Sequence, residues 1–215
     1  GFLIGHAAEC DRMTDVLSRA GNPNVLLVGA PGAGKNTLVA HLAFQMSRDR
    51  IPAPLFDKRL VQLDLGSLVS GTSPAELSSR ITRIVNEIIA AGNVILYIPD
   101  THLLLKTTGG QSWMSAAEIL LPAIKSSAFS VIGATYPQEF KTYLEPQSDF
   151  VSMFEVMRVQ EITEEEAVRF LVYDSLMLER RYKPMISFAA VKQAVKLAHQ
   201  HFRQKLLPSS AEDIL

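Results

Sequence analysis

The sequence contains one cysteine, Cys10, among 215 residues. A single thiol can form neither an intramolecular disulfide nor a thiolate metal cluster, so we interpret it as a buried or idle side chain. The five histidines show no HExxH spacing and do not gather with carboxylates. A zinc site built from these side chains is therefore not expected.

An excess of charge of one sign is also missing, because 21 Lys+Arg stand against 22 Asp+Glu. Without a basic stripe interleaved with aromatics, binding to nucleic acid is not expected. The apolar runs, such as 94–98, fall far short of the ~20 residues that cross a bilayer, and no cleavable leader opens the sequence. We therefore expect a soluble protein without membrane contact, in the cytoplasm or in an organelle matrix of a eukaryote.

What is present is an alternation of strand-length apolar runs with helical patterns. Such alternation implies crossover connections and a mostly parallel sheet covered on both faces, that is, an α/β fold. The clearest helix start is Ser73, followed by Pro74 and by Glu76, which would close a capping box. The expected strands lie at 25–28, 60–65, 94–98, 129–132 and 154–159.

The strand signals stop after residue 160. Thr163 and Glu166 form a second capping box that opens a helix to about residue 181, and an amphipathic helix follows from about Ser187. We predict an α/β core over 1–160 and a small helical subdomain over 161–215. The last residues look like the opening of another helix, so we expect the chain to be a fragment.

Residues 29–37, GAPGAGKNT, directly follow the first apolar run. Gly29, Gly34 and Lys35 satisfy the phosphate-binding pattern G-x-x-x-x-G-K-[ST], in which backbone N–H groups, a helix N-terminus and the lysine hold phosphates. Its last position normally supplies a hydroxyl to Mg²⁺. That position is Asn36, and Thr37 comes one residue late. The predicted nucleotide-binding residues are Gly29, Pro31, Gly32, Ala33, Gly34, Lys35, Asn36 and Thr37.

Several further motifs occur in a fixed order: Leu3-Ile4-Gly5-His6, Asp11 to Leu17, Leu63-Asp64-Leu65-Gly66, Ile132-Gly133-Ala134-Thr135 and Leu207-Pro208. With the loop, they make the chain resemble the first ATPase domain of the Clp family of AAA+ unfoldases, ClpA, ClpB and ClpC, over nearly its whole length. The resemblance adds Ile4 and Gly5, from the segment that lines the family's adenine pocket, to the nucleotide-binding residues. His6 stands where the family usually has Arg.

The resemblance also implies an architecture and an assembly. It implies an AAA+ P-loop three-layer sandwich with a five-stranded parallel sheet in the order 5-1-4-3-2 and a small α-helical lid. It further implies ATP or ADP as cofactor and hexameric rings that thread protein substrates.

The catalytic motifs depart from the family pattern. The family's acidic pair, Asp-Glu after a buried strand, positions Mg²⁺ and the attacking water, and here Pro99 and Asp100 follow the strand. Asp100 is thus the only candidate catalytic residue and, with Asn36 and Thr37, a weak Mg²⁺ ligand. In an alternative register Asp100 contacts the metal and Thr101 orients the water. His102 matches a family histidine that we interpret as structural.

Other active-site positions also differ. Tyr136 occupies the position of the polar γ-phosphate sensor, and Ser152 and Met153 occupy those of two arginines that reach a neighbouring subunit. The segment 71–74 lacks the aromatic residue that grips substrate in the pore. We interpret the remaining candidates as ordinary surface or packing residues: Arg158, Arg180, Arg181 and Trp113.

The resemblance and its departures together favour a pseudo-ATPase. The chain would bind ATP or ADP, with Mg²⁺ in doubt, as a structural or regulatory element of a ring formed with itself or with intact Clp-like subunits. Two alternatives remain open. One is an active but divergent Clp-like ATPase that uses Asp100 as its base, and the other is an adaptor whose loop binds no nucleotide.

Overall fold

A five-stranded sheet in the order β2-β3-β4-β1-β5 forms the centre of the computed structural model, which describes residues 5–69, 73–105, 111–183, 185–201, 206–207, 209–212 and 214. All neighbouring strands are parallel. The predicted order is confirmed. The strands are β1 (Val25–Val28), β2 (Arg59–Gln62), β3 (Val94–Ile98), β4 (Ser130–Thr135) and β5 (Glu155–Arg158).

Two of the expected strand ranges need correction. The run 60–65 is not one strand, because β2 ends at Gln62 and α3 (Leu65–Val69) begins three residues later. Asp64 makes the turn: its carboxylate accepts from the backbone N–H of Ser67 at 3.2 Å and from its hydroxyl at 2.6 Å. β4 runs further than the expected 129–132, because its final residues, from Gly133 on, are small and lack the large apolar side chains that indicate a strand.

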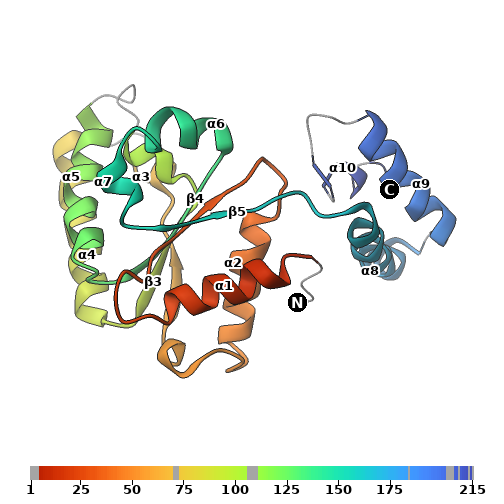
Figure 1. Cartoon of the computed structure of the whole chain (residues 1–215), viewed down its shortest axis with the longest axis horizontal. Helices are drawn as coiled ribbons and strands as arrows, with labels where there is room; N and C mark the ends of the chain where they lie inside the picture. Colours follow the sequence, from red (N-terminus) through yellow and green to blue (C-terminus); the bar gives the residue numbers. More distant parts are fainter. Residues whose placement is uncertain are drawn as a thin grey trace.

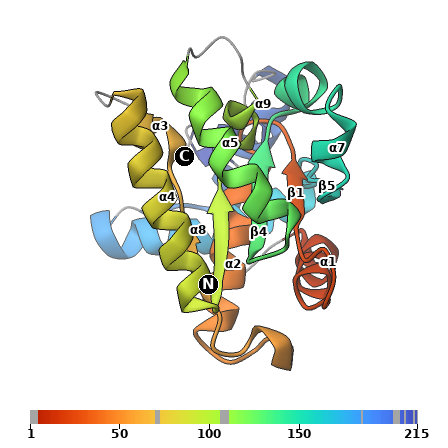
Figure 2. The ribbon, with the colours of Figure 1, turned by 90° about the vertical axis from the view of Figure 1, so that its left-hand side faces the viewer.

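Helices cover both faces of the sheet (Figure 1). α1 (Ala7–Leu17) and α2 (Lys35–Met46) share one apolar cluster with Val25, Leu27 and other side chains of the sheet. On the opposite face α4 (Pro74–Ala91) and α5 (Gln111–Lys125) lie side by side, as Figure 2 shows. The three-layer α/β arrangement is thereby confirmed.

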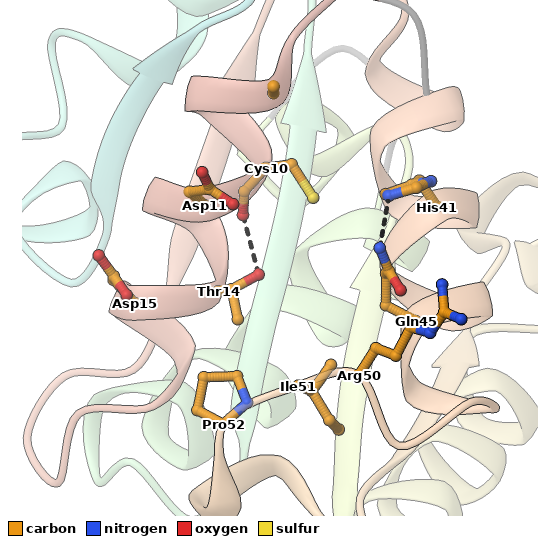
Figure 3. A pocket seen from close by; sticks show the side chains of 10 residues that line it. Cys10, Asp11, Thr14, Asp15, His41, Gln45, Arg50, Ile51 and Pro52 are labelled. Carbon is orange, nitrogen blue, oxygen red and sulfur yellow. Dashed lines mark hydrogen bonds between the residues drawn. The ribbon is translucent and has the colours of Figure 1, made fainter. Parts of the chain in front are cut away.

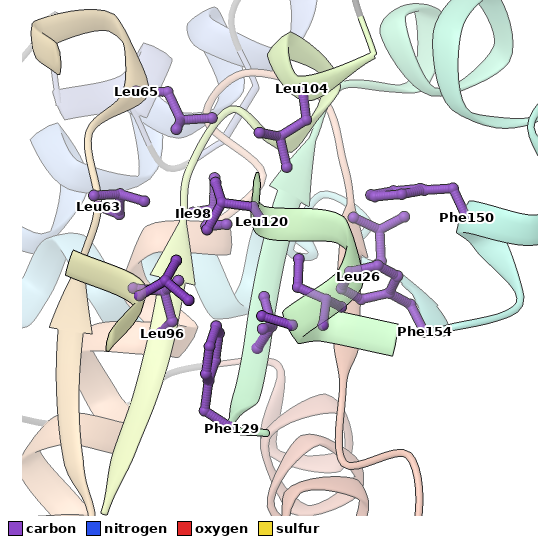
Figure 4. Close-up of a cluster of buried hydrophobic side chains, with 14 of the residues drawn as sticks. Leu26, Leu63, Leu65, Leu96, Ile98, Leu104, Leu120, Phe129, Phe150 and Phe154 are labelled. Atoms are coloured by element: carbon purple, nitrogen blue, oxygen red, sulfur yellow. The ribbon is translucent and has the colours of Figure 1, made fainter. Parts of the chain in front are cut away.

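The cluster on the α4–α5 face is shown in Figure 4. Leu26, Leu96 and Ile98 point from the sheet into this layer and pack with Leu120 of α5 and Phe129. Alternate residues of β1 and β3 thus serve opposite faces, as the period of two along a strand requires. Shorter elements complete the core: η1 (Ala53–Leu55), η2 (Thr101–Leu104), α6 (Pro137–Glu139), the π-helical η4 (Phe140–Leu144) and α7 (Ser148–Val151).

The helices that follow β5 pack with one another at one end of the molecule (Figure 1). They are α8 (Glu164–Tyr182), α9 (Phe188–His201) and α10 (Ser209–Glu212). A separate apolar cluster, which includes Leu171, Val195 and Ala211, holds them together. This cluster supports the division that we propose after residue 160. No helix among the described residues is long and apolar enough to span a bilayer.

The predicted capping box of α8 is present. The Thr163 hydroxyl accepts from the Glu166 N–H at 3.3 Å, and the Glu166 carboxylate accepts from the Thr163 backbone N–H at 2.9 Å. At Ser73 the hydroxyl accepts from the Glu76 N–H at 3.4 Å, while the Glu76 carboxylate binds Arg80 at 2.6 Å. Both predicted helix starts are confirmed, but the capping box expected at Ser73 is only half formed, because the Glu76 carboxylate binds Arg80 instead.

The cap of α8 leads to a pH-dependent prediction. The backbone N–H and the hydroxyl of Thr163 lower the pKa of Glu166 below its ordinary value of 4.5. The carboxylate's stabilisation of the folded state is therefore complete above that value and is lost as pH falls through the lowered pKa. We expect Thr163→Ala to lower the stability of α8 by about 1 kcal/mol near pH 7, and by less in acid. Hydrogen exchange at the first turn of α8 measures this.

Thr142→Ala is the matched control, because the Thr142 hydroxyl is exposed and donates only to the Gln138 carbonyl at 2.9 Å. It should leave exchange in α8 unchanged. Equal protection of α8 in both variants would contradict a stabilising role of the cap.

Candidate nucleotide-binding site

The loop between β1 and α2 is shaped by its backbone. The Gly29 N–H donates to the Thr135 carbonyl at 3.2 Å, and the Ala33 N–H closes a turn on Ala30 at 3.1 Å. Gly32 and Gly34 have φ values of 81° and 93°, in the left-handed region that favours glycine. α2 starts directly afterwards, so the loop leads into the N–H groups of a helix N-terminus, which favour anions.

Two of the loop glycines are also required by close contacts. A Cβ at Gly29 would lie 2.6 Å from the carbonyl oxygen of Val159, and one at Gly34 would lie 3.0 Å from Nε2 of His6. The backbone of the loop is therefore held between β5 and the N-terminal segment. Pro31 and Gly32 are exposed, whereas Ala33 is buried against the sheet.

The N-terminal segment contacts both the phosphate loop and the start of the helical lid, which consists of α8, α9 and α10. A Cβ at Gly5 would lie 2.7 Å from Cγ2 of Ile162, the residue before the cap of α8. The His6 side chain is 7% exposed, its Nδ1 lies 3.8 Å from Glu9, and its Nε2 has no hydrogen-bond partner within the described part of the chain. Gly5 thus stands between loop and lid, and His6 covers the loop. Ile4 lies outside the described residues.

The Lys35 ammonium is folded onto its own loop. Its Nζ donates to the carbonyls of Gly29 at 2.5 Å and Ala30 at 3.0 Å, and lies 4.5 Å from the centre of the Tyr136 ring. Burial lowers the pKa of Lys35, and the negative charge of Asp100 acts in the opposite direction. A buried cation held by neutral carbonyls can exchange them for phosphate oxygens, which form stronger charge-assisted hydrogen bonds.

Asn36 is tied to the sheet by a contact that the sequence did not reveal. The hydroxyl of Tyr97, which is 4% exposed, donates to Oδ1 of Asn36 at 2.6 Å. Burial, followed by the charges of Asp100 and Tyr136, raises the pKa of Tyr97 to about 12. The hydroxyl therefore remains a donor at neutral pH. Thr37 is exposed at the first turn of α2.

The segment after β3 is built around a buried threonine. Thr101 is fully buried, its hydroxyl donates to the Ile98 carbonyl at 3.0 Å, and a Cβ at Gly133 would lie 2.6 Å from its Oγ1. A side chain buried in this way has no contact with solvent water. This burial argues against the alternative register, in which Thr101 would orient the water.

Asp100 is partly exposed and precedes η2 at the same edge of the sheet as the loop. Its charge acts on Lys35, Tyr97 and Tyr136. Pro99, in the other acidic position, offers no ligand. Among the described residues no three His, Cys, Asp or Glu side chains are grouped so that they could hold a metal ion. The positions that supply the hydroxyl and the carboxylate of the magnesium site in this class of loop thus hold Asn36 and Pro99, so the site fits poorly, and Thr37 and Asp100 stay weak candidates.

Two side chains fill the space beside β4. His102 is buried, and its Nδ1 lies 3.2 Å from the Thr135 hydroxyl. The Tyr136 ring lies 6.1 Å from the His102 ring and faces Lys35. Burial, and then the charge of Asp100, raises the pKa of Tyr136. An aromatic face therefore lies against Lys35 at the position where the Clp pattern has a polar γ-phosphate sensor. The contacts of His102 fit the structural role that we predicted.

The surface near β5 carries no free arginine at the two expected positions. Ser152 donates from its hydroxyl to the Asp149 carbonyl at 2.9 Å, and Met153 packs against the apolar core. The nearby Arg12 and Arg19 both bind Glu155, at 2.8 and 2.6 Å.

The remaining sequence candidates add nothing to the site. Arg158 and Arg180 are exposed, as predicted. The side chains of Arg181 and Trp113 lie outside the described residues, as do residues 71–72 of the expected pore segment.

A groove of 550 Å³ lies between α1 and α2, away from the phosphate loop (Figure 3). Cys10 and Thr14 line it from α1, His41 and Gln45 from α2, and Arg50 from the following segment. Nε2 of Gln45 lies 3.1 Å from Nε2 of His41. Side chains of both charges and an apolar wall line the groove, so its chemistry does not indicate any one class of ligand.

Cys10 in this groove gives a reactivity prediction. Burial, and then the charge of Asp11, raises the pKa of its thiol, while a hydrogen bond with Thr14 acts in the opposite direction. Because the thiolate is the nucleophile, we expect alkylation by iodoacetamide near pH 7 to be at least about tenfold slower than in the unfolded chain. Mass spectrometry of timed samples, with the urea-unfolded chain as control, measures this. Equal rates would show that the thiol is exposed.

The fold and the loop together define a nucleotide-binding α/β protein, and comparison with known proteins specifies its class. The family model described as "ATPase family associated with various cellular activities (AAA)" matches residues 25–156, which is more than half of the chain. The chain therefore belongs to the AAA family.

The similarities are to Clp proteins. ClpC/MecB of Bacillus subtilis, a negative regulator of genetic competence, and the chaperone protein ClpB of Oceanobacillus iheyensis are each 32% identical over 214 residues. The match covers 99% of this chain but only 26% of either relative. The ADP complex of S. cerevisiae Hsp104 has a TM-score of 0.88 at 28% identity, over 99% of this chain and 30% of that one. The extended Hsp104:casein complex has a TM-score of 0.86 at 28% identity, over 98% and 36%.

These comparisons confirm the predicted relationship: the chain is a Clp-type AAA+ ATPase domain. It spans about a quarter of the length of the curated relatives, 26% in each case. The activity of a whole Clp protein is therefore a matter of proposal for this chain.

Proposed function

We propose that this domain binds ATP or ADP, hydrolyses ATP poorly if at all, and serves as a structural or regulatory element of a protein-remodelling ring. One contrast carries the proposal. The phosphate loop has the backbone and the lysine that it needs, whereas the positions that activate water and stabilise the transferring phosphoryl group hold Pro99, Tyr136, Ser152 and Met153.

The residues of the loop would hold the nucleotide. The backbone N–H groups of residues 32–37 and the N-terminus of α2 would bind phosphate oxygens, and Lys35 would leave its carbonyl partners for the outer phosphates. Gly5 and His6 stand at the junction of loop and lid, where the family places the base. The cofactor-binding residues that we propose are those predicted from the sequence: Gly29, Pro31, Gly32, Ala33, Gly34, Lys35, Asn36, Thr37, Ile4 and Gly5.

Hydrolysis would be slow because several contributions are missing together. The loss of one stabilising donor typically lowers a rate by about 10² to 10³, and an arginine finger contributes about 10³ to 10⁵. Asp100 is the one carboxylate that we place beside Lys35. It is therefore the residue through which a divergent active ATPase, the competing proposal, would have to work.

The relatives support our proposal of ring assembly and protein substrates. Hsp104 forms a complex with casein, and the similarity of this chain to Hsp104 supports a place in a comparable assembly. Partners would be further copies of this chain or intact Clp-like subunits. Lacking arginines at Ser152 and Met153, the domain would not activate its neighbour and would act by occupying a place in the ring.

Nucleotide binding and turnover, measured in parallel, test this function. We expect a fluorescent ADP analogue to bind the purified chain, and Lys35→Ala to abolish binding. Steady-state ATP turnover, alone and mixed with intact Clp-type subunits, should be at least about 10³-fold below that of a domain with its arginine fingers.

Brisk turnover that is lost in both Lys35→Ala and Asp100→Asn would instead establish the active ATPase. If the chain bound no nucleotide at all, the adaptor hypothesis, in which the loop has no ligand, would be favoured.

A further inference from the structure

We propose that this site takes nucleoside diphosphates without a divalent cation and discriminates against triphosphates, with Tyr97 and Asp100 as the residues that set this preference. The inference rests on the nucleotide binding proposed above. It concerns which nucleotide is held and in which form, and it comes from contacts around Asn36 and Lys35.

The first contact engages Asn36, one of the two loop side chains, with Thr37, that we considered as metal ligands. Oδ1 of Asn36 accepts the Tyr97 hydroxyl at 2.6 Å, and Tyr97 is fixed in β3 opposite Gln62 and Ile132 of the flanking strands. Tyr97 is 4% exposed, so its hydroxyl has little contact with water to replace Asn36. A metal ion that recruited Asn36 would have to share this oxygen or leave a buried donor unpaired, which is unfavourable.

The second ligand position is also blocked. Pro99 follows β3 where a carboxylate would hold the metal, and the neighbouring hydroxyl of Thr101 donates to Ile98. Mg²⁺ in nucleotide sites is held by one or two carboxylates together with phosphates and waters. Of the two positions after β3, only Asp100 keeps a carboxylate, and its charge already acts on Lys35.

Without a divalent cation, the charge balance depends on Lys35 and Asp100. Lys35 is the cation of the loop, and Tyr136 presents a ring face 4.5 Å from it. Asp100 lies at the same edge of the sheet, two residues beyond Ile98. A further phosphoryl group beside Lys35 brings negative charge within range of this carboxylate, and no metal ion offsets the repulsion. A diphosphate leaves that region free.

The test is calorimetric titration of the nucleotide-free chain with ADP and with ATP, each in EDTA and in excess Mg²⁺. We expect ADP affinity to be the same in both buffers within about twofold, and ATP in EDTA to bind about tenfold more weakly than ADP. Asp100→Asn should recover about that factor for ATP while changing ADP much less. Tyr97→Phe, which frees Asn36, should make ADP binding respond to Mg²⁺.

Each substitution has a matched control. Asp57→Asn neutralises an exposed acid at the opposite edge of the sheet, and Tyr173→Phe removes an exposed hydroxyl on α8. Both should bind as the unaltered chain does. Thermal melts confirm that every variant is folded.

The outcomes separate this inference from the function on which it rests. ADP binding that requires Mg²⁺, or ATP binding as tightly as ADP in EDTA with no response to Asp100→Asn, would overturn the inference and leave nucleotide binding intact. No heat with any nucleotide in either buffer would overturn both.

Discussion

Replacing Lys35 by methionine is expected to lower the affinity for ADP about 100-fold, because a charge-assisted hydrogen bond to phosphate is lost. The same substitution should not destabilise the nucleotide-free chain. The Lys35 side chain is only 8% exposed, and burial lowers its pKa, so the native fold opposes its charge. Methionine keeps the apolar stem without the ammonium. Calorimetric titration and urea unfolding measure the two effects separately.

The pH dependence provides a second check. A folded-state pKa below the ordinary value of 10.5 means that the unfolded chain binds more protons in alkali. The stability of the unaltered chain should therefore rise, relative to Lys35→Met, as pH increases from the lowered pKa to that value. Lys125→Met, at an exposed position at the end of α5, is the control and should bind ADP normally. A large loss of stability in Lys35→Met would show that the ammonium stabilises the empty loop.

Asn24→Ala is expected to have the largest effect on stability. Asn24 is fully buried before β1, where its Oδ1 accepts from the Val131 N–H at 2.9 Å and its Nδ2 donates to the Met153 carbonyl at 3.1 Å. Alanine leaves both backbone groups unpaired in the core. Since each such group costs about 1–3 kcal/mol, we expect a loss of about 2–4 kcal/mol. In a chain of this length this lowers the melting temperature by about 5–15 °C.

Asn93→Ala is the control, because its amide makes a single exposed hydrogen bond to the Asp57 carbonyl at 2.9 Å. That loss should be within about 0.5–1.5 kcal/mol. If both variants had the same melting temperature, Asn24 would not be the link between β1, β4 and the segment before β5 that its hydrogen bonds indicate.

Much of the fold could be predicted because its signals are local. β1 and β3 were found at their observed residues, since both are uninterrupted apolar runs, and the cap at Thr163 follows from residues three apart. The end of β2 and the length of β4 could not be predicted in this way. The first depends on the Asp64 turn. The second depends on small residues such as Gly133, which Thr101 and Leu26 approach closely.

In the candidate site, too, local features could be predicted from the sequence and long-range contacts could not. The loop from Gly29 to Lys35 is contiguous and has a known pattern, so the sequence locates it. The bond between Tyr97 and Asn36 joins residues 61 positions apart, and the buried ties of Asn24 span more than 100. No sequence period indicates such partners. In the sequence, Tyr97 is one more residue of an apolar strand. Its polar hydroxyl, two positions before Pro99, is the only sign that it has a hydrogen-bond partner.

The bond between Tyr97 and Asn36 also bears on how readily this domain could regain a magnesium site in evolution. Exchanging Asn36 alone for a hydroxyl residue removes the amide oxygen that accepts from the part-buried Tyr97 hydroxyl, at a cost of about 1 kcal/mol. Exchanging Tyr97 alone frees Asn36 but still leaves Pro99 where a carboxylate is needed. Neither single exchange thus restores the complete site. Because the benefit of one substitution depends on another, such epistasis makes a return to a magnesium site rare. A lineage that has reached this arrangement is therefore expected to drift further from catalysis.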